Sequence, residues 1–447
     1  MAAPPNCQFP TGLNAPQYPL SREEFRRALS TGHGRVKLHV ERFGAREFRD
    51  EILEAATVCK VYDPGCEGSR EDWLADLCFA AGVQETVLAQ SPSEDPSDRN
   101  QRAALLLQFA KRGVPGAREA LYACWGQGHY SNFYATKEIV ELDGDAGVLF
   151  VAREIGSLIQ QDADLSISTV EFWEYDESRT EGAARALLAN AADSDALIRT
   201  YLDEVELEEA RVESWRGGRN DARRTIGEVL EAIRSNTEQY GAGWVRTWAT
   251  RASRAELEVV LAELFSLTHP RAIEACLRCL GGSGLPPLLP LVFELTRHED
   301  AEVRYWAARV LSKHSLPGVR AWGLESLARG DSYVALEILK RSAQVDDADA
   351  IVAAVRRDED RNDQHGVCGG VLDILENCTE ICDPRLALQV YEHTPCTNCR
   401  EKSVEWLLEQ RLCPPWVLGE CASDADEGIR ELAARARSPQ SPPPAVS

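Results

Sequence analysis

A short motif that recurs in the C-terminal half of the chain most constrains its fold. Residues 300–311 read Asp-x-x-Val-Arg-x-x-Ala-Ala-x-x-Leu, and residues 426–433 repeat Asp-x-x-Ile-Arg-x-x-Ala. A degraded copy, Cys-Arg-x-x-Ser-Val-x-x-Leu, occupies residues 399–407. Each copy follows a short segment with helical periodicity, so the repeating unit is a pair of helices. Because stacked pairs pack mainly on their neighbours, 447 residues can fold without one large core, and we predict an all-α solenoid.

Apolar spacing and turn residues divide the C-terminal half into consecutive helix pairs. Arg304 and Arg430 lie 126 residues apart, which corresponds to four steps of about 31 residues, a length typical of two-helix repeats. The predicted pairs are 254–267 with 271–280, 287–297 with 302–313, 318–329 with 333–343, 348–357 with 364–376, 384–393 with 397–410, and 415–422 with 427–436.

The motif residues have a physical role in such a unit. Asp300 and Asp426 stand where a side-chain oxygen caps the unpaired amide groups of a helix N-terminus. Arg304, Arg400 and Arg430 follow one turn later, where each can stack on the next repeat and pair with its Asp. The small and branched residues after them face the core between helices. We therefore interpret these Asp and Arg residues as structural.

With these residues the chain resembles the HEAT-repeat proteins, whose second helix begins with the Asp-x-x-Val-Arg-x-x-Ala-Ala pattern. The resemblance covers residues 252–437. The segments Gly34-Arg35-x-x-x-His39, 66–70 and 396–401 are similar to large, uncharacterised bacterial HEAT-repeat proteins. The resemblance implies a right-handed superhelix that usually binds proteins, although a minority of the family acts on DNA bases or bilin chromophores. It supplies no catalytic residue that can be placed in this chain.

The N-terminal half has helical periodicity without the clear motif. Ser21 and Glu24 form a capping-box pattern at the first helix, and further helical segments are predicted at 36–43, 47–56, 71–81, 105–111, 117–125, 135–142 and 148–158. We divide the chain into an irregular segment (1–20), N-terminal helical repeats (21–160), an irregular helical region (161–251), C-terminal repeats (252–437) and a Pro-rich disordered tail (438–447).

The charge balance excludes some functions. A net charge of −23 disfavours nonspecific binding to nucleic acid, which needs many cations against phosphate, and is compatible with a basic partner. The N-terminus lacks the pattern of a signal peptide, and no apolar run reaches the ~20 residues that a membrane helix needs. The sequence therefore predicts a cytoplasmic protein without membrane contact, and its Arg- and Ala-rich composition is typical of a GC-rich bacterial genome.

Cysteines concentrate near the C-terminus. Cys378-x3-Cys382 and Cys396-x2-Cys399 have spacings known from zinc sites, with His393 nearby. Three interpretations stay open: buried core residues, a metal site, or a redox-active thiol pair. Cys396 and Cys399 are the best candidates for metal or redox chemistry because they begin a helix. We predict that the protein binds no cofactor, and the alternative is a bound zinc ion.

Arginine and aromatic residues interleave between residues 211 and 254. This pattern can anchor a protein partner, stack nucleic-acid bases, or simply pair with neighbouring carboxylates. The partner-binding candidates are Trp215, Arg216, Arg219, Tyr240, Trp244, Arg246, Trp248 and Arg251.

No phosphate-binding loop, zinc-protease motif or nucleophile elbow is present in the sequence, and no reaction is indicated. We predict an interaction scaffold or adaptor that binds a protein partner on the concave face of the solenoid. One alternative is a HEAT-like enzyme that binds or processes nucleic acid, and another is a HEAT-type lyase or thiol-dependent modifier.

Overall fold

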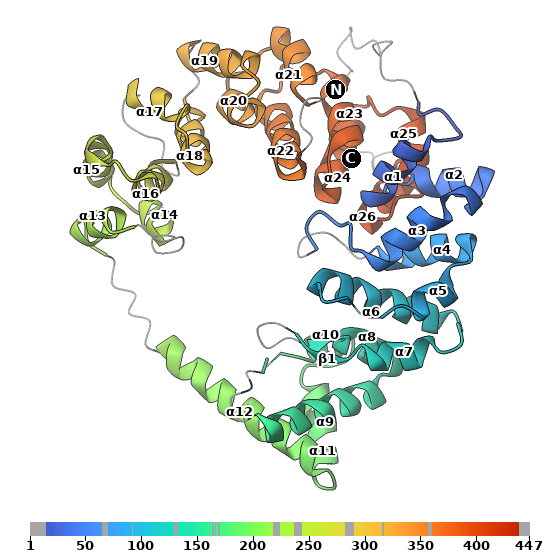
Figure 1. The fold of residues 1–447 in the computed structure, drawn as a ribbon. Helices are drawn as coiled ribbons and strands as arrows, with labels where there is room; N and C mark the ends of the chain where they lie inside the picture. Colours follow the sequence, from blue (N-terminus) through green and yellow to red (C-terminus); the bar gives the residue numbers. More distant parts are fainter. Residues whose placement is uncertain are drawn as a thin grey trace, which may run out of the picture. The chain divides into compact units, whose positions relative to one another are not determined.

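The computed structural model is all-α, as predicted. It describes residues 15–64, 70–91, 93–128, 133–162, 165, 167–168, 170–217, 224–236, 244–281, 290–314, 317–355 and 360–437. Across these ranges the chain forms 26 α-helices, three short 3-10 helices and one two-stranded hairpin (Figure 1). None of the helices described is both long enough and apolar enough to cross a membrane.

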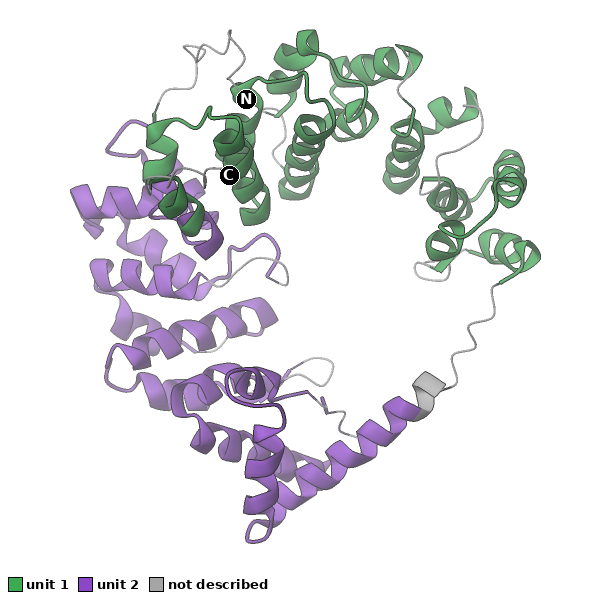
Figure 2. Cartoon of the chain, turned by 180° about the vertical axis from the view of Figure 1, so that it is seen from behind, with its two compact units in different colours: residues 1–15, 221–419, 431–447 green, residues 16–220, 420–430 purple. Residues whose placement is uncertain are grey.

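The chain divides into two compact units (Figure 2). Unit 1 comprises residues 1–15, 221–419 and 431–447, and unit 2 comprises residues 16–220 and 420–430. Unit 2 is therefore discontinuous in sequence, because a short segment near the C-terminus belongs to it.

Unit 2 is built from short helices in sequence order. Ser21 caps the first of them as predicted. Its hydroxyl accepts a hydrogen bond from the Glu24 amide, and the Glu24 carboxylate accepts one from the Ser21 amide at 2.8 Å. The elements are α1 (Arg22–Ser30), α2 (Arg35–Phe43), η1 (Arg46–Phe48), α3 (Arg49–Thr57), α4 (Glu71–Ala81), α5 (Gln84–Leu88), α6 (Pro96–Lys111), α7 (Ala117–Ala123), β1 (Gly126–Gln127), β2 (Phe133–Tyr134), α8 (Thr136–Asp143), α9 (Asp145–Gln161), α10 (Trp173–Glu177), α11 (Ala183–Ala192) and α12 (Ala196–Gly217).

Two helices of unit 2 extend beyond their predicted limits. α6 begins at Pro96 rather than at residue 105, because Asp95 accepts the amides of Ser97 and Asp98 and Pro96 suits the first helical position. α12 continues through Trp215 and Arg216, so a long regular helix lies within the region that was predicted to be irregular. The antiparallel hairpin of β1 and β2 was not predicted.

Residues 420–430 complete unit 2 by packing on its first helices. The Trp73 indole donates to the Ser423 carbonyl at 3.0 Å, and the Ala425 amide donates to the Gly32 carbonyl at 2.9 Å. Gly34 permits this approach, because a Cβ atom there would lie 1.9 Å from the Glu420 carbonyl oxygen. The first and last parts of the sequence thus share one core.

Unit 1 contains the motif copies at residues 300–311 and 399–407, and the copy at residues 426–433 is divided between the two units. Its predicted helix pairs all appear, with ends that differ by a few residues. The elements are α13 (Ile226–Arg234), α14 (Trp244–Ala249), α15 (Arg254–Glu263), η2 (Leu264–Ser266), α16 (Pro270–Gly281), α17 (Pro290–Leu295), α18 (Ala301–Leu311), α19 (Pro317–Ala328), α20 (Ser332–Leu339), η3 (Val345–Asp347), α21 (Ala348–Val355), α22 (Arg361–Asn377), α23 (Pro384–His393), α24 (Thr397–Glu409), α25 (Pro415–Cys421) and α26 (Glu427–Arg437), the last two shared with unit 2.

The second helix of each pair stacks on the second helix of the next. α14, α16, α18, α20, α22 and α24 contact one another in that order, and α19, α21 and α23 form a parallel row. The core between the rows contains the small and branched motif residues, since Val303, Ala307 and Leu311 are fully buried. Equivalent positions in successive pairs therefore come to lie along one face of the row, as in an α-solenoid.

The motif Asp residues cap their helices as expected, and the contacts of Arg304 differ from the expected ones. Asp300 caps α18 by accepting the Glu302 and Val303 amides, and Asp426 accepts the Ile429 amide. The Arg304 guanidinium donates to the carbonyls of residues 298 and 299 at 2.9 Å, and it acts on the next repeat's Asp331 only through its charge. In the degraded copy, the side chain of Arg400 is completely buried.

Candidate functional site

The structure places the Arg/Trp candidates of the sequence in different settings. Arg219 and Tyr240 lie outside the described residues, and only the backbone of Trp215 and Arg216 is described, at the end of α12. Arg251 is exposed just after α14. The remaining candidates, Trp244, Arg246 and Trp248, lie on α14.

Trp248 is a core residue, and its assignment to a partner surface is wrong. Its side chain is only 7% exposed, and its indole donates to the Arg224 carbonyl at 2.9 Å. The short α14 turns Val245, Trp248 and Ala249 to the inside, so the ring packs between helices. Trp244, in contrast, is half-buried, with the Arg224 guanidinium 4.1 Å from its ring centroid.

Arg246 belongs to a group of cations around a second tryptophan. It is exposed on α14, and its guanidinium carbon lies 5.9 Å from the ring centroid of Trp306 on α18. Arg278 on α16 and Arg309 on α18 approach the same ring, at 5.1 and 5.2 Å. Three guanidinium groups from three stacked helices therefore surround one buried indole, an arrangement in which the ring faces attract the cations.

Two of these arginines belong to a regular series. Arg278, Arg309 and Lys340 recur every 31 residues, the length of one helix pair, at the ends of α16, α18 and α20. Because these helices contact one another in order, the three cations lie along one face of the row. Together with Arg246, Lys313 and Arg341, they form what we call the cationic face.

Carboxylates lie beside three of these cations. Glu274 pairs with Arg278 at 2.6 Å, and Glu337 pairs with Lys340 at 2.5 Å and lies 3.9 Å from Arg309. Asp373 adds a distant contact to Lys340 at 3.9 Å. The side chains of Glu274 and Glu337 are buried, so these two carboxylates belong to the packing of the repeat row.

Burial and neighbouring cations both affect the acidity of Lys313. Burial lowers the pKa of the Lys313 ammonium, and the charges of Arg341, Lys340 and Arg309 lower it further. Neighbouring cations that repel one another in this way favour the binding of an anion between them. Of this face, the sequence analysis identified only Arg246; the 31-residue series was readable in the sequence but was overlooked.

The cysteine candidates lie on the last stacked helices. Cys396 is the N-cap residue of α24 and Cys399 lies in its first turn. His365 on α22 approaches them, with its Nδ1 atom 3.8 Å from the Cys399 sulfur, and the ligand atoms of all three side chains lie within 4.8 Å of one another. Cys378 and Cys382, also considered for a zinc site, do not join this group and instead contact the Lys340 carbonyl and the Gln410 amide oxygen.

The two thiols of this group differ in acidity. Hydrogen bonds from Cys399 and His365, with the charge of the His365 ring, lower the pKa of the Cys396 thiol against the opposing effect of burial. The pKa of Cys399 is raised, because its proton is held by Cys396 and the group is buried. Cys396 is therefore the more acidic thiol of the two.

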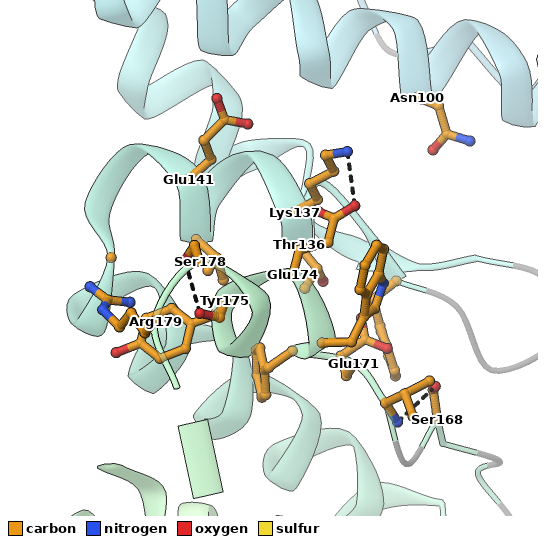
Figure 3. A pocket seen from close by; sticks show the side chains of 16 residues that line it. Asn100, Thr136, Lys137, Glu141, Ser168, Glu171, Glu174, Tyr175, Ser178 and Arg179 are labelled. Atoms are coloured by element: carbon orange, nitrogen blue, oxygen red, sulfur yellow. Dashed lines mark hydrogen bonds and ion pairs between the residues drawn. The ribbon is translucent and has the colours of Figure 1, made fainter. Parts of the chain in front are cut away.

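Unit 2 contains a cavity of about 770 Å³ beside α8 and α10 (Figure 3). Two apolar side chains at its rim are unusually exposed, Val170 at 62% and Trp173 at 54%. Lys137 crosses from α8 to Glu174 on α10 at 2.9 Å, as the dashed line in Figure 3 shows. The cavity therefore combines apolar anchors with charged groups, as binding pockets do.

Two carboxyl groups of unit 2 have perturbed acidity, and one of them lines this cavity. Burial raises the pKa of Glu171, which lines the cavity, to about 7, against a hydrogen bond from Thr136 that lowers it. Burial likewise raises the pKa of Glu138 on α8 to about 7. Both groups therefore change charge near neutral pH, which the sequence could not show because carboxylates are abundant throughout the chain.

Comparison with known proteins adds little about function. No family model and no curated protein matches the chain. Two solved structures of the karyopherin Kap121p resemble it, one bound to the SUMO protease Ulp1p (TM-score 0.29) and one bound to Pho4p (TM-score 0.30). Each is 14% identical, and the alignment covers 94% of this chain and 45% of the karyopherin chain. The chain thus spans less than half the length of these proteins, and the likeness is too distant to indicate function.

Proposed function

We propose that this protein is a protein-binding scaffold whose cationic face binds an acidic segment of a partner protein. The observation that carries the proposal is the 31-residue series of Arg278, Arg309 and Lys340, joined by Arg246 around the Trp306 ring. The HEAT-like pattern of the sequence supports it, because such repeats usually bind proteins.

A repeated cation suits an extended acidic chain. Two successive helix pairs place a part-exposed arginine, Arg278 or Arg309, at an equivalent position, so carboxylates spaced along a partner can meet successive repeats. Arginine is favoured at such surfaces because its planar guanidinium binds a carboxylate through two hydrogen bonds. The half-buried Trp244 and the exposed Arg251 adjoin Arg246 in sequence and extend the proposed contact.

The charge of the whole chain favours a protein partner over nucleic acid. The positive excess is confined to a few side chains, whereas a net charge of −23 repels a long polyanion. Nonspecific nucleic-acid binding depends on many simultaneous phosphate contacts, which this face cannot supply alone. A short acidic segment of a protein needs only a few contacts with cations.

The test uses two exposed members of the cationic face. The double variant Arg246→Glu/Arg341→Glu reverses their charge, and a matched control, Arg254→Glu, reverses an arginine whose side chain is 76% exposed elsewhere on unit 1. Binding of a labelled poly-glutamate peptide and of a labelled single-stranded oligonucleotide is measured by fluorescence anisotropy at two salt concentrations. We expect the double variant to weaken peptide binding at least tenfold and the control to leave it unchanged.

Two outcomes contradict the proposal. One is peptide binding that is equal in the wild type and the double variant. The other is tighter binding of the oligonucleotide than of the peptide, which would favour the nucleic-acid alternative.

A further inference from the structure

Three side chains from two neighbouring helix pairs converge in unit 1. His365 lies on α22, and Cys396 and Cys399 lie at the start of α24. The helices contact each other, and the three ligand atoms lie within 4.8 Å of one another. Among the residues that the structure describes, this is the one such grouping of three or more His, Cys, Asp or Glu side chains.

The spacing of the atoms suits a tetrahedral metal ion. Zinc binds sulfur at about 2.3 Å and nitrogen at about 2.0–2.1 Å, so a tetrahedral angle separates an S and an N ligand by roughly 3.6 Å. The measured distance from the Cys399 sulfur to His365 Nδ1 is 3.8 Å. An ion could therefore be held between the three groups with small side-chain adjustments.

The chemistry of the donors also suits zinc. Two thiols and an imidazole are the borderline-soft ligands that this ion prefers. Cys396 and Cys399 are only 5% and 8% exposed, which shields their bonds to a metal from water, while the half-buried His365 leaves an entry path. Cys368, one turn beyond His365 on α22, lies outside the group of three.

A second Cys-x2-Cys pair shows what an ordinary buried pair looks like. Cys276 and Cys279 lie within α16 and are completely buried. Their sulfurs contact the carbonyl oxygens of Val260 and Val245, at 3.2 and 3.7 Å, and they join no histidine. The Cys-x2-Cys spacing alone therefore does not distinguish the two pairs. The pair Cys396 and Cys399 differs because His365 lies beside it.

We propose that His365, Cys396 and Cys399 form a zinc site that ties α22 to α24. The ion would join two consecutive helix pairs through strong coordinate bonds, in addition to their apolar packing. Metal binding by a folded protein stabilises the folded state, so the site would strengthen this end of the repeat row. The inference is independent of the proposed partner binding.

The experiment uses the full chain, reduced and then exposed to zinc ions. Excess zinc is removed by gel filtration, and retained metal is measured by mass spectrometry. Cobalt substitution then reports thiolate ligands through charge-transfer absorption. The variants are Cys399→Ser and His365→Gln, with Cys279→Ser as the matched control, and circular dichroism verifies folding in each.

We expect the wild type and Cys279→Ser to retain one zinc ion per chain. Chelator competition should show that His365→Gln and Cys399→Ser each weaken zinc binding by more than about 100-fold. Such a loss exceeds what is expected when a residue that only supports a metal ligand is replaced. If Cys399→Ser fails to fold, the half-buried His365 variant still decides the matter.

The proposal is overturned if the reduced, folded wild type retains no zinc. It is also overturned if Cys279→Ser loses as much bound zinc as Cys399→Ser does. Recovery of a Cys396–Cys399 disulfide from protein that binds no zinc when reduced would also overturn it and would favour a redox thiol pair.

Discussion

Arg304 and Arg430 make the same two hydrogen bonds although 126 residues separate them. In each case Nη1 donates to the backbone carbonyls six and five residues earlier, at 2.9 Å for Arg304 and at 2.8 and 2.6 Å for Arg430. The guanidinium thus ties the turn before the helix to the helix itself. This explains why the motif needs arginine, which can donate to both carbonyls at once.

Replacing Arg304 should therefore weaken the fold without affecting the cationic face. We expect Arg304→Ala to lower the free energy of unfolding by about 1–3 kcal/mol, because two carbonyls, one in a part-buried and one in an exposed hydrogen bond, lose a charged donor. Urea denaturation measures the change, with Arg254→Ala as the surface control. Wild-type stability in Arg304→Ala would show that water replaces the guanidinium without cost.

The two perturbed carboxyl groups of unit 2 should make stability depend on pH. The folded pKa of Glu138 and Glu171 is about 7, above the ordinary value of 4.5, so the folded state holds the proton more tightly than the unfolded state. The stabilisation is therefore complete below about pH 4.5 and is lost as the pH rises through about 7, by up to roughly 3 kcal/mol per group.

Denaturation curves between pH 4.5 and 8 test this dependence. The variants Glu138→Gln and Glu171→Gln should each flatten it, since an amide does not ionise. Glu119→Gln, at an exposed position, should leave it unchanged. If the free energy of unfolding still depends on pH in the variant that carries both Gln substitutions, the dependence arises from other titratable groups.

The ion pair between Arg35 and Glu420 should be sensitive to the loss of one partner. The two groups lie 2.9 Å apart, and their side chains are 7% and 2% exposed. We expect Arg35→Met to destabilise the protein by about 3–5 kcal/mol, because it leaves a buried carboxylate without this partner. Arg35→Met/Glu420→Gln should recover part of the loss, and a double-mutant cycle by urea denaturation measures how much. A loss in the double variant equal to the sum of the losses in the two single variants would mean that the two side chains do not interact.

The two tryptophans of α14 should behave differently when truncated. Trp248→Ala should lower the free energy of unfolding by about 3–5 kcal/mol, as the loss of a buried aromatic ring does. Trp244→Ala should cost much less stability, because its ring is half-buried, and should weaken peptide binding. Thermal denaturation and the anisotropy assay separate these effects. A large loss of stability in Trp244→Ala would place its ring in the core as well.

Local signals allowed most helices to be predicted, because their causes lie within a few residues. The segments 71–81 and 384–393 coincide with α4 and α23, and the Ser21 cap was recognised from its Glu24 partner. The start of α6 was missed although Asp95-Pro96 marks it. Trp248 was misassigned because an isolated six-residue helix has no periodicity that identifies its inner face.

The remaining features depend on contacts that no local pattern contains. His365 approaches Cys399 only because α22 stacks on α24, 34 residues later. The acidity of Glu171 depends on its burial beside α8, which its neighbours in sequence do not reveal. Likewise, nothing in residues 420–430 indicates that they pack against Trp73.

The packing of residues 420–430 on the first helices of unit 2 determines when this core can form during synthesis. Arg35 and Glu420 are separated by 385 residues, so a ribosome adding about 5–20 residues per second needs roughly 20–80 s to travel from one to the other. Throughout that interval the surface around Trp73 and Gly34 is displayed by the nascent chain before its covering segment has been translated. Unit 2 therefore acquires its complete core only after residues 420–430 have been translated, and a chaperone that shields this surface would do so during elongation.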